Sequence, residues 1–527
     1  MRPPGLRLLY EALLASAEEA PDRTAVITHD ERVSYAELLD RARRIAVVLQ
    51  DRGVERGDRV AIFMDNSVTA VAAIYGASMA GGAFMFVNPQ TKQDKLRYIL
   101  NDSGTSAMIA DDRLVSIAEG AAAGAPALRV LLATRGDAPR SGSVEDLEDA
   151  LAATRHGPRS VGSIALDLAA LVYTSGSTGN PKGVMLSHQN MVFTTESLIE
   201  YLRLSSADRI LNVLPLAFDY GLYQAIMAIR LAATLVLEPS FAFPAHVVTR
   251  VQEEGVTVIP GVPTVFARLI ALHRSHPITM PTVRTITNTA AHLPDDYVPI
   301  LHQMSPGAAV YKMYGLTECK RVSYLDPDLI GDRPASVGKA IPGTEVQVLD
   351  DDRRPVAAGE RGVLYVRGPH VMMGYWNLPE ETARVLVPGR YHGERMLCTH
   401  DVFRMDADGF LYFVGRKDDI IKSRGEKVSP VEVENVLHGI PGVREAAVIG
   451  VPDDVLGEAV RAYVVMSDGA VADERAFRRQ CMARLENHMV PRDVVFLDEL
   501  PKTSSGKVRK QSLRDHEVAS KEEAMEP

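Results

Sequence analysis

The feature that most constrains the fold is a regular alternation of short apolar runs with helix-like runs between residues 20 and 415. Examples are "RVAIFM" followed by "VTAVAAIYGASMA", and "ATLVLE" followed by "PAHVVTRVQEEG". Strands that alternate with helices are typical of α/β proteins, so the pattern predicts a doubly wound architecture. Hydrophobic residues make up 46% of the chain and charged residues 24%, which allows the large buried core that this architecture needs.

The pattern changes near residue 340. The short runs "TEVQVLD", "GVLYVRG" and "FLYFVG" are separated by Gly, Pro and Asp, which predicts a β-rich subdomain. Residues 415–428 gather charges and glycines without a hydrophobic period, and they are the best candidate for a linker. Beyond them we expect a small α+β domain that contains the helix "SPVEVENVLHGI", with Ser429 as its cap and Glu432 completing a capping box.

Several functional classes are disfavoured by composition. The net charge of −10 argues against a general nucleic-acid-binding protein, which needs a basic face. Residues 70–87 lack charge but are rich in alanine, so we expect a core helix, a turn and a buried strand there rather than a membrane span. The N-terminus resembles an amphipathic helix more than a signal peptide. Cys319, Cys398 and Cys481 have no metal-binding spacing, and we expect buried, reduced thiols in a cytoplasmic protein.

One glycine-rich stretch indicates phosphate binding. It runs from Tyr173 to Val184 and reads "YTSGSTGNPKGV", between a predicted strand and a predicted helix that Ser187 caps. Glycines allow backbone N–H groups to turn towards an anion, and Lys182 adds a point charge for a polyphosphate. The order differs from a Walker loop, in which Gly-Lys-Ser/Thr leads directly into the helix. The candidate phosphate-binding residues are Thr174, Ser175, Gly176, Ser177, Thr178, Gly179 and Lys182.

The stretch resembles the phosphate loop of the adenylate-forming superfamily, which includes acyl-CoA synthetases, adenylation domains of nonribosomal peptide synthetases, and luciferases. Further motifs follow in that family's order: "GDRVAIFMDNS", "VPTVFARL", "MYGLTE", "SVGKAIPG", "VRGPHVMMGYWNLPEET", "GRKDDIIKSRGEKVSPVEVE" and "ELPKTSSGKVRK". The chain is most similar in style to stand-alone AMP-forming acyl-CoA ligases. The resemblance implies a large N-terminal domain over residues 1–415, a hinge at 416–419 around Asp418, and a small mobile C-terminal domain over 420–527.

The resemblance also implies roles for individual residues. Tyr314 would stack on adenine, Thr317 would face the α-phosphate, and Glu318 would bind Mg²⁺, which favours oxygen ligands. Asp401 would accept hydrogen bonds from the ribose hydroxyls, and Arg416 would contact ribose or phosphate. Lys507 would be the catalytic lysine that bridges the attacking carboxylate and the α-phosphate. Taken alone, "YGLTE" is also typical of a turn before a helix, and Lys507 of a surface loop.

The implied reaction is an ATP- and Mg²⁺-dependent adenylation of a carboxylic acid, with release of pyrophosphate and transfer of the acyl group to a thiol. CoA is the first expectation for that thiol. The alternatives are the phosphopantetheine of a carrier protein loaded with an amino acid, a non-thiol acceptor, another oxyanion as substrate, or a non-catalytic nucleotide-binding module. A multidomain synthetase module is disfavoured because no carrier-protein segment follows Lys507.

The substrate pocket is expected at Phe218, Asp219, Asn288 and Gly315. Asp219 would either pair with a substrate ammonium or cap the helix "YGLYQAIMAIRLA". Lys320 and Arg321 would either meet an acidic substrate tail or the acceptor's phosphates, or form a solvated basic pair, and solvation is the expectation. His400 stands where the family usually has glycine, and we expect it to be a solvated loop residue.

Overall fold

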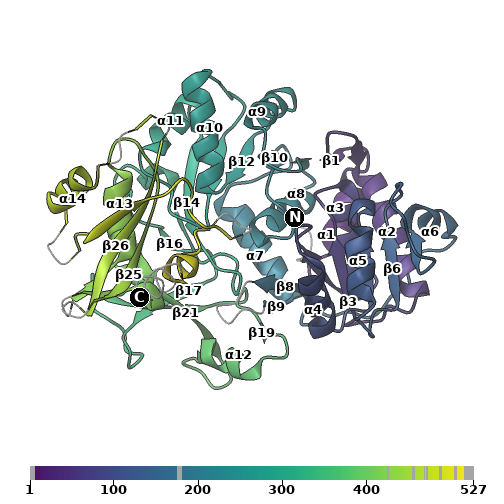
Figure 1. Ribbon diagram of the computed structural model, residues 1–527. Coiled ribbons are helices and arrows are strands. Elements are labelled where there is room, and N and C mark those ends of the chain that lie inside the picture. Colours follow the sequence, from purple (N-terminus) through teal and green to yellow (C-terminus); the bar gives the residue numbers. More distant parts are fainter. Residues whose placement is uncertain are drawn as a thin grey trace, which may run out of the picture.

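The computed structural model describes residues 6–174, 181–423, 426–453, 457–467, 469–470, 473–485, 489–503 and 507–515 (Figure 1). A large N-terminal α/β region fills most of the view, and the small C-terminal region, in yellow-green, lies against one side of it. This arrangement confirms the expected fold class.

The first large sheet has nine strands and a parallel centre. Its strand order is β16 (Lys339–Ala340), β15 (Ser323–Leu325), β14 (Ala309–Tyr314), β13 (Thr285–Asn288), β12 (Val258–Gly261), β10 (Arg209–Asn212), β11 (Thr234–Leu237), β1 (Thr24–Ile27) and β2 (Arg32–Ser34). The neighbouring strands from β14 to β1 in this order pair in parallel. Strands β15 and β16 at one edge and β2 at the other pair antiparallel. A parallel centre with antiparallel edges is common in doubly wound folds.

The second large sheet has eight strands. Its order is β19 (Gly374–Tyr375), β9 (Lys182–Ser187), β8 (Leu168–Thr174), β4 (Ala83–Val87), β3 (Arg59–Phe63), β5 (Ala107–Ala110), β6 (Val130–Ala133) and β7 (Val144–Asp146). Along β3, Val60 and Ile62 join the core between the two sheets, whereas Ala61 and Phe63 face the core on the other side. Both faces of this strand are buried, which explains why "RVAIF" is apolar throughout.

Helices cover the two sheets. They are α1 (Glu11–Glu19), α2 (Tyr35–Asp51), α3 (Val68–Met79), α4 (Gln93–Ser103), α5 (Val115–Ala122), α6 (Leu147–Ala153), α7 (His188–Tyr201), α8 (Asp219–Arg230), α9 (Pro244–Glu253), α10 (Pro263–Ser275) and α11 (Tyr297–Met304), with 3₁₀ turns η1 (Asp112–Leu114) and η2 (Pro327–Leu329). Helix α3 is buried along its whole length and is followed by β4, as expected for residues 70–87. Among the described residues, no helix has the length and apolarity to cross a membrane.

Two smaller sheets complete the fold. The β-rich subdomain contains β17 (Glu345–Leu349), β18 (Arg361–Arg367), β20 (Leu386–Pro388), β21 (Arg395–Met405) and β22 (Leu411–Arg416), with α12 (Pro379–Val385) beside it. After η3 (Lys417–Asp419), the C-terminal sheet contains β23 (Ile421–Ser423), β24 (Glu426–Val428), β25 (Val443–Asp453), β26 (Gly457–Met466) and β27 (Asp493–Phe496), with helices α13 (Pro430–His438) and α14 (Glu474–Met482). Part of the predicted linker is therefore the β23–β24 hairpin.

The cap positions predicted at Ser187 and Ser429 are confirmed, but the capping box expected from Glu432 does not form, and the setting of the glycine-rich loop differs from the prediction. Ser187 accepts a hydrogen bond from the Asn190 backbone N–H, and Ser429 accepts one from Glu432. The loop, however, joins β8 to the antiparallel strand β9, with Thr174 opposite Lys182, and α7 follows only after β9. The sequence predicted that the loop leads from a strand to a helix, but the loop is followed by a second strand.

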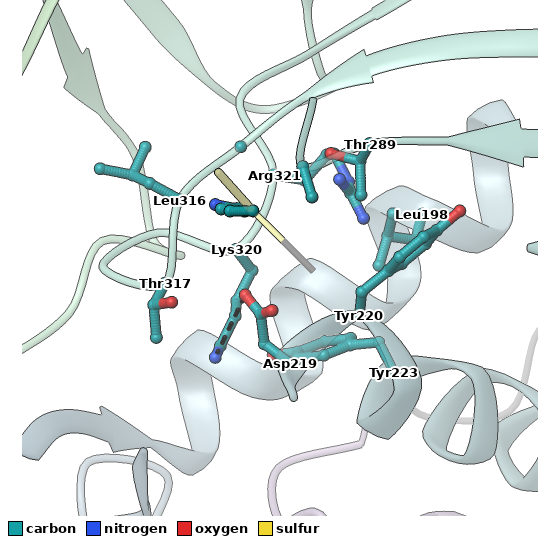
Figure 2. Close-up of a pocket in the computed structure, with 12 residues that line it drawn as sticks. Leu198, Asp219, Tyr220, Tyr223, Thr289, Leu316, Thr317, Lys320 and Arg321 are labelled. Carbon is teal, nitrogen blue, oxygen red and sulfur yellow. Dashed lines mark ion pairs between the residues drawn. The ribbon is translucent and has the colours of Figure 1, made fainter. Parts of the chain in front are cut away.

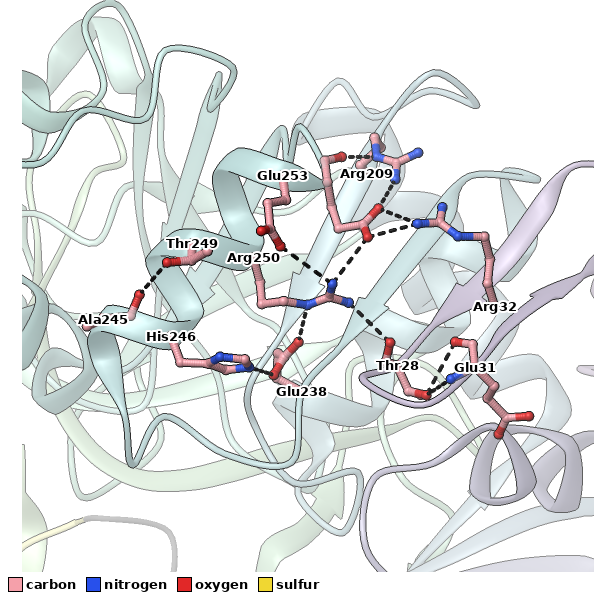
Figure 3. Close-up of polar contacts among 11 residues, drawn as sticks. Thr28, Glu31, Arg32, Arg209, Glu238, Ala245, His246, Thr249, Arg250 and Glu253 are labelled. Carbon is pink, nitrogen blue, oxygen red and sulfur yellow. Dashed lines mark hydrogen bonds and ion pairs between the residues drawn. The ribbon is translucent and has the colours of Figure 1, made fainter.

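A cluster of charged residues around the buried carboxylates Glu238 and Glu254 links α9 to the first sheet (Figure 3). The Arg250 guanidinium donates to Glu238 at 3.0 Å, to Glu254 at 3.3 Å and to the Thr28 carbonyl at 3.1 Å. Glu254 also pairs with Arg32 at 2.8 Å and with Arg209 at 2.7 Å. We call Glu238, Arg250, Glu254, Arg32 and Arg209 the closed cluster. In the described part of the chain, none of its members has a buried polar side-chain atom without a partner.

Candidate functional site

A cavity of about 60 Å³ lies where α8, α7, the loop after β13 and the loop after β14 meet (Figure 2). Its lining residues are Leu198, Asp219, Tyr220, Tyr223, Thr289, Ala290, Gly315, Leu316, Thr317, Lys320, Arg321 and Lys507. Four predicted site residues thus come together from three segments that are distant in sequence: Asp219 from α8, Gly315 and Thr317 from the loop after β14, and Lys507 from near the C-terminus. Lys507 reaches the cavity from the C-terminal domain, on a segment in which its backbone N–H donates to Thr503 Oγ1.

A tight backbone approach shapes the loop after β14. A Cβ atom on Gly315 would lie 2.2 Å from the Lys320 carbonyl oxygen, so glycine is required at that position. Lys320 itself has φ of +62°, in the left-handed region that few side-chain-bearing residues adopt. The loop therefore folds back on itself and directs Lys320 and Arg321 into the protein.

Tyr314, Asp401 and Arg416 form one hydrogen-bonded group beside this loop. The Tyr314 hydroxyl donates to Asp401 Oδ2, and Arg416 Nε donates to Asp401 Oδ1 at 2.8 Å. Burial and the neighbouring carboxylate raise the pKa of Tyr314 well above its usual value. Tyr314 also lies edge-on to Phe403, with 4.8 Å between ring centroids. Three predicted nucleotide-binding residues are thus in direct contact.

Tyr375, which sequence reasoning did not single out, contacts both Glu318 and Lys182. The Tyr375 hydroxyl donates to Glu318 Oε1 at 2.8 Å, and Lys182 Nζ lies 5.5 Å from the Tyr375 ring centroid. Lys182 also donates to Glu381 Oε2, on α12, at 2.7 Å. Tyr375 lies within the quoted motif "VRGPHVMMGYWNLPEET", but its letters alone do not show which carboxylate it contacts.

Some predicted residues lie elsewhere or outside the described part of the chain. Ser175, Gly176, Ser177, Thr178 and Gly179 fall outside the described residues, as does the side chain of Asp418, so their roles stay predictions. Thr174 is the last residue of β8. Phe218 and Asn288 do not line the cavity, and the neighbours Thr289 and Ala290 line it instead.

The capping alternative for Asp219 is wrong. Phe218 holds the cap position of α8, and Asp219 is the first helical residue, with no side-chain cap hydrogen bond. The Asp219 carboxylate instead lies 3.8 Å from Lys320 Nζ. An acidic residue in the first turn still favours the helix through the helix dipole.

The expectation that Lys320 and Arg321 are solvated is also wrong. Each residue is only 5% exposed. Lys320 Nζ lies 5.9 Å from the Tyr223 ring centroid and Arg321 Cζ lies 5.3 Å from that of Tyr220. Burial lowers the pKa of Lys320, while Asp219 opposes that shift. The sequence suggested exposure because lysine and arginine are rarely buried, and only the tertiary approach of α8 reverses this.

His400 is not a solvated loop residue. It lies within β21, is half-buried, and has φ of +56°, a conformation that suits glycine. The three cysteines are buried, as expected. Within the described residues no group of three or more His, Cys, Asp or Glu side chains is arranged to hold a metal ion. A carboxylate such as Glu318 still fits Mg²⁺, because this ion is commonly held by one or two carboxylates together with substrate phosphates and water.

Comparisons with known proteins agree with this geometry. The AMP-binding enzyme family model matches residues 13–376, and the model for the AMP-binding enzyme C-terminal domain matches residues 432–507. A feruloyl-CoA synthase from Amycolatopsis is 34% identical over 94% of this chain and 96% of its own length. A long-chain-fatty-acid–CoA ligase from Bacillus subtilis is 30% identical over 97% and 95%. The crystal structure of ATP-bound MatB from Rhodopseudomonas palustris superposes with a TM-score of 0.87 at 32% identity, covering 96% and 98%.

Proposed function

The chain belongs to the AMP-binding enzyme family, and from this premise we propose that it activates a carboxylic acid with ATP and transfers the acyl group to CoA. The observation that carries the proposal is that Thr317 and Lys507, from different domains, line one cavity. Relatives that are named CoA ligases and that match along nearly the whole chain support CoA over other acceptors. Their names cover feruloyl and long-chain acyl groups, so they do not identify the acid.

The Tyr314–Asp401–Arg416 group would hold the nucleoside. Asp401 is 6% exposed and already accepts two hydrogen bonds, from Tyr314 and Arg416, which fixes the direction of its carboxylate. A fixed, buried carboxylate suits a ribose diol, which offers two hydroxyl donors. The glycine-rich loop and Lys182 would hold the β- and γ-phosphates, with Lys182 leaving its present partner Glu381.

Lys507 and Thr317 would act where the new bond forms. A carboxylate oxygen of the substrate attacks the α-phosphorus, the bond to the β-phosphate oxygen breaks, and pyrophosphate leaves. Both reactants are anions, so cationic Lys507 lowers their repulsion and stabilises the charge that builds on the phosphoryl oxygens. The Thr317 hydroxyl donates a hydrogen bond to the α-phosphate. Positioning and charge stabilisation account for most catalysis of phosphoryl transfer.

Mg²⁺ fits this site through Glu318, whose carboxylate Tyr375 already orients. When bound, the ion neutralises phosphate charge. Tyr375 would contribute by holding Glu318 Oε1 and so keeping the carboxylate in one orientation. We place the reaction in the cytoplasm, where ATP and CoA are available and buried cysteines stay reduced.

The second half-reaction transfers the acyl group. The CoA thiol attacks the acyl carbonyl, the bond to the phosphate oxygen breaks, and AMP leaves. In this proposal, Lys507 acts from the cavity in the adenylating step, and its place among the lining residues supports that role. The thioester-forming step would require this domain to turn about residues 416–419 and withdraw Lys507, as domain closures of this type do in other enzymes.

Two assays in sequence test the proposal. The first measures exchange of labelled pyrophosphate into ATP with a panel of fatty, aromatic, amino and dicarboxylic acids, with and without Mg²⁺. The second adds CoA and detects the thioester and AMP. Exchange followed by thioester formation is expected. Exchange without thioester, but with loading of a carrier protein or an amine, would reject CoA as the acceptor, and no exchange with any acid would reject the adenylation itself.

A further inference from the structure

The cavity beside Thr317 contains a second charge cluster, formed by Asp219, Lys320 and Arg321, which we call the open cluster. Lys320 Nζ is buried and has no hydrogen-bond partner. It lies 3.8 Å from Asp219 Oδ2, which is close enough for an ion pair but too far for a hydrogen bond. Arg321 Nε is also buried without a partner. Among the described residues, Asp219 is thus the one carboxylate within ion-pair distance of Lys320, and no ion pair is formed by Arg321. A buried cation with unsatisfied donors is costly unless a ligand completes it.

The backbone gives an independent sign of function. Lys320 and Ala290, which both line the cavity, have φ of +62° and +75°. Non-glycine residues in this region cost free energy, and such residues cluster at ligand-binding sites. The cost at Lys320 is coupled to the position of its side chain, because the same turn buries both Lys320 and Arg321. The strain and the unsatisfied donors therefore occur at the same wall of the cavity.

The reacting carboxylate does not account for these cations. That group must lie near Thr317 and Lys507, where the α-phosphorus would be attacked. Figure 2 shows Thr317 and Arg321 on opposite sides of the Lys320 side chain. Glu318, the nearest other carboxylate of the loop, is held by Tyr375. The unsatisfied donors thus face the part of the pocket that would receive the far end of the acid.

We propose that the acid substrate is short and carries a second anionic group, most simply a second carboxylate, which binds Lys320 and Arg321. This proposal rests on the proposed function and names its substrate class. A neutral acyl tail would leave both cations unsatisfied, and a substrate ammonium would add a third cation next to a single carboxylate. The rings of Tyr220 and Tyr223 line the cavity and would keep water from Lys320 and Arg321. The cavity of about 60 Å³ favours a short acid.

The test compares acids that differ only in the charge of the far end. Pyrophosphate exchange is measured with diacids of three to six carbons, with their half-amides, and with the matching amino acids that carry a terminal ammonium; succinate, succinamate and 4-aminobutyrate are one such set. For at least one length, the diacid should exceed its half-amide in kcat/KM by roughly ten- to hundredfold, which corresponds to charge-assisted hydrogen bonds. The amino acid should be the poorest of the three.

Variants of the open cluster give opposite expected changes. Lys320→Met should remove most of the preference for the diacid, chiefly by raising KM. Asp219→Asn removes the competing carboxylate, so it should strengthen the preference. Lys95→Met, on the exposed face of α4, is the matched control and should leave the preference unchanged. A purely structural cluster predicts parallel losses with all acids in both variants.

Each remaining outcome decides between the two proposals. If no diacid exceeds its half-amide, or the ammonium-bearing acid is preferred, the second-anion proposal is wrong. Exchange with neutral fatty or aromatic acids but with none of the diacids also overturns it and leaves the proposed function intact. Absence of exchange with every acid, diacids and panel acids together, overturns the proposed function itself.

Discussion

The closed cluster around Arg250 and the open cluster around Lys320 both contain buried charges, but they differ in how many hydrogen-bond partners those charges have. Arg250 donates to two carboxylates and a backbone carbonyl, and Glu254 receives three arginines. Lys320 has one carboxylate beyond hydrogen-bond distance, and its Nζ has no hydrogen-bond partner. A cluster whose charged groups all have hydrogen-bond partners needs no ligand, whereas a cavity-lining cluster with unpaired donors can bind one. Completeness of the partners, rather than burial, thus separates a structural charge from a binding charge.

The largest effect is expected for the third cation of the cavity. Lys507→Ala should lower the rate of adenylate formation about 10²- to 10³-fold, as for loss of one donor to a developing oxyanion. ATP binding, measured by calorimetry, should change little. Thioester formation from a chemically prepared acyl adenylate and CoA should persist, because Lys507 has no part in that step. Lys502→Ala is the control, since Lys502 pairs with Glu445 at an exposed position. Unchanged pyrophosphate exchange in Lys507→Ala would contradict the assignment.

The closed cluster should respond in stability rather than in activity. Arg250→Met leaves the buried Glu238 and Glu254 with fewer partners, and the free energy of unfolding should fall by about 3 kcal/mol. Urea unfolding monitored by circular dichroism measures this change. The preference among acids should not move in the folded fraction. A loss below about 1 kcal/mol would show that the remaining partners are sufficient: Arg32 and Arg209 for Glu254, and His246, whose Nε2 lies 3.6 Å from Glu238 Oε2, for Glu238.

The buried, neutral side chain of His188 makes the stability of the fold depend on pH. His188 is 3% exposed, and its Nδ1 accepts a hydrogen bond from the Leu9 backbone N–H. Burial lowers the pKa of His188 from 6.5 to about 4. Between these values the unfolded chain binds a proton that the folded chain does not, so stability falls as the pH drops from about 6.5 towards 4. At pH 5 this costs on the order of 2 kcal/mol relative to pH 7.

The measurement is urea unfolding at pH 7 and pH 5 in wild type and in His188→Gln. The variant cannot take up that proton, so its loss of stability between the two pH values should be smaller than the wild-type loss. The other buried histidines, such as His370, remain in both proteins and cancel in the comparison. Equal losses in the two proteins would show that His188 does not titrate in this range.

The smallest change in stability is expected for the open cluster. Lys320→Met removes a buried, incompletely satisfied cation, and Asp219 stays partly exposed in the first turn of α8. The free energy of unfolding without substrate should therefore change by less than about 1 kcal/mol. A loss as large as that of Arg250→Met would remove the distinction between the two clusters.

Local features of the fold were predictable from the sequence, and features that depend on tertiary contacts were not. Strand–helix alternation and the caps Ser187 and Ser429 depend on neighbouring residues, so they appear as patterns in the sequence. The burial of Lys320 and Arg321 depends on α8 packing against the loop after β14. The strand β9 was missed because its first three residues, "KGV", belong to the glycine-rich stretch itself, and no strand was predicted between that stretch and the helix capped by Ser187.

The site residues divide in the same way. The quoted motifs contain Gly315, Thr317 and Lys507, the resemblance added Asp219 as a pocket residue, and all four line the cavity. Phe218 and Asn288 were expected in the pocket because the family resemblance places its acyl pocket at their segments, but their neighbours line the cavity instead. Phe218 holds the cap position of α8, and Asn288 ends β13 with its side-chain amide donating to the Gly261 carbonyl. Tyr375 was overlooked because its contact with Glu318 joins distant segments.

Calorimetric binding of two sulfamoyl-adenosine analogues of the acyl adenylate tests most directly whether Lys320 and Arg321 receive a second anionic group. The analogues carry the same short chain, one ending in a carboxylate and the other in the corresponding amide, so that only the charge facing Lys320 and Arg321 differs. The carboxylate analogue should bind about ten- to hundredfold more tightly, and Lys320→Met should reduce that difference. Equal affinities, tighter binding of the amide, or no binding of either analogue would contradict the claim that the open cluster is the receptor for a second anionic group.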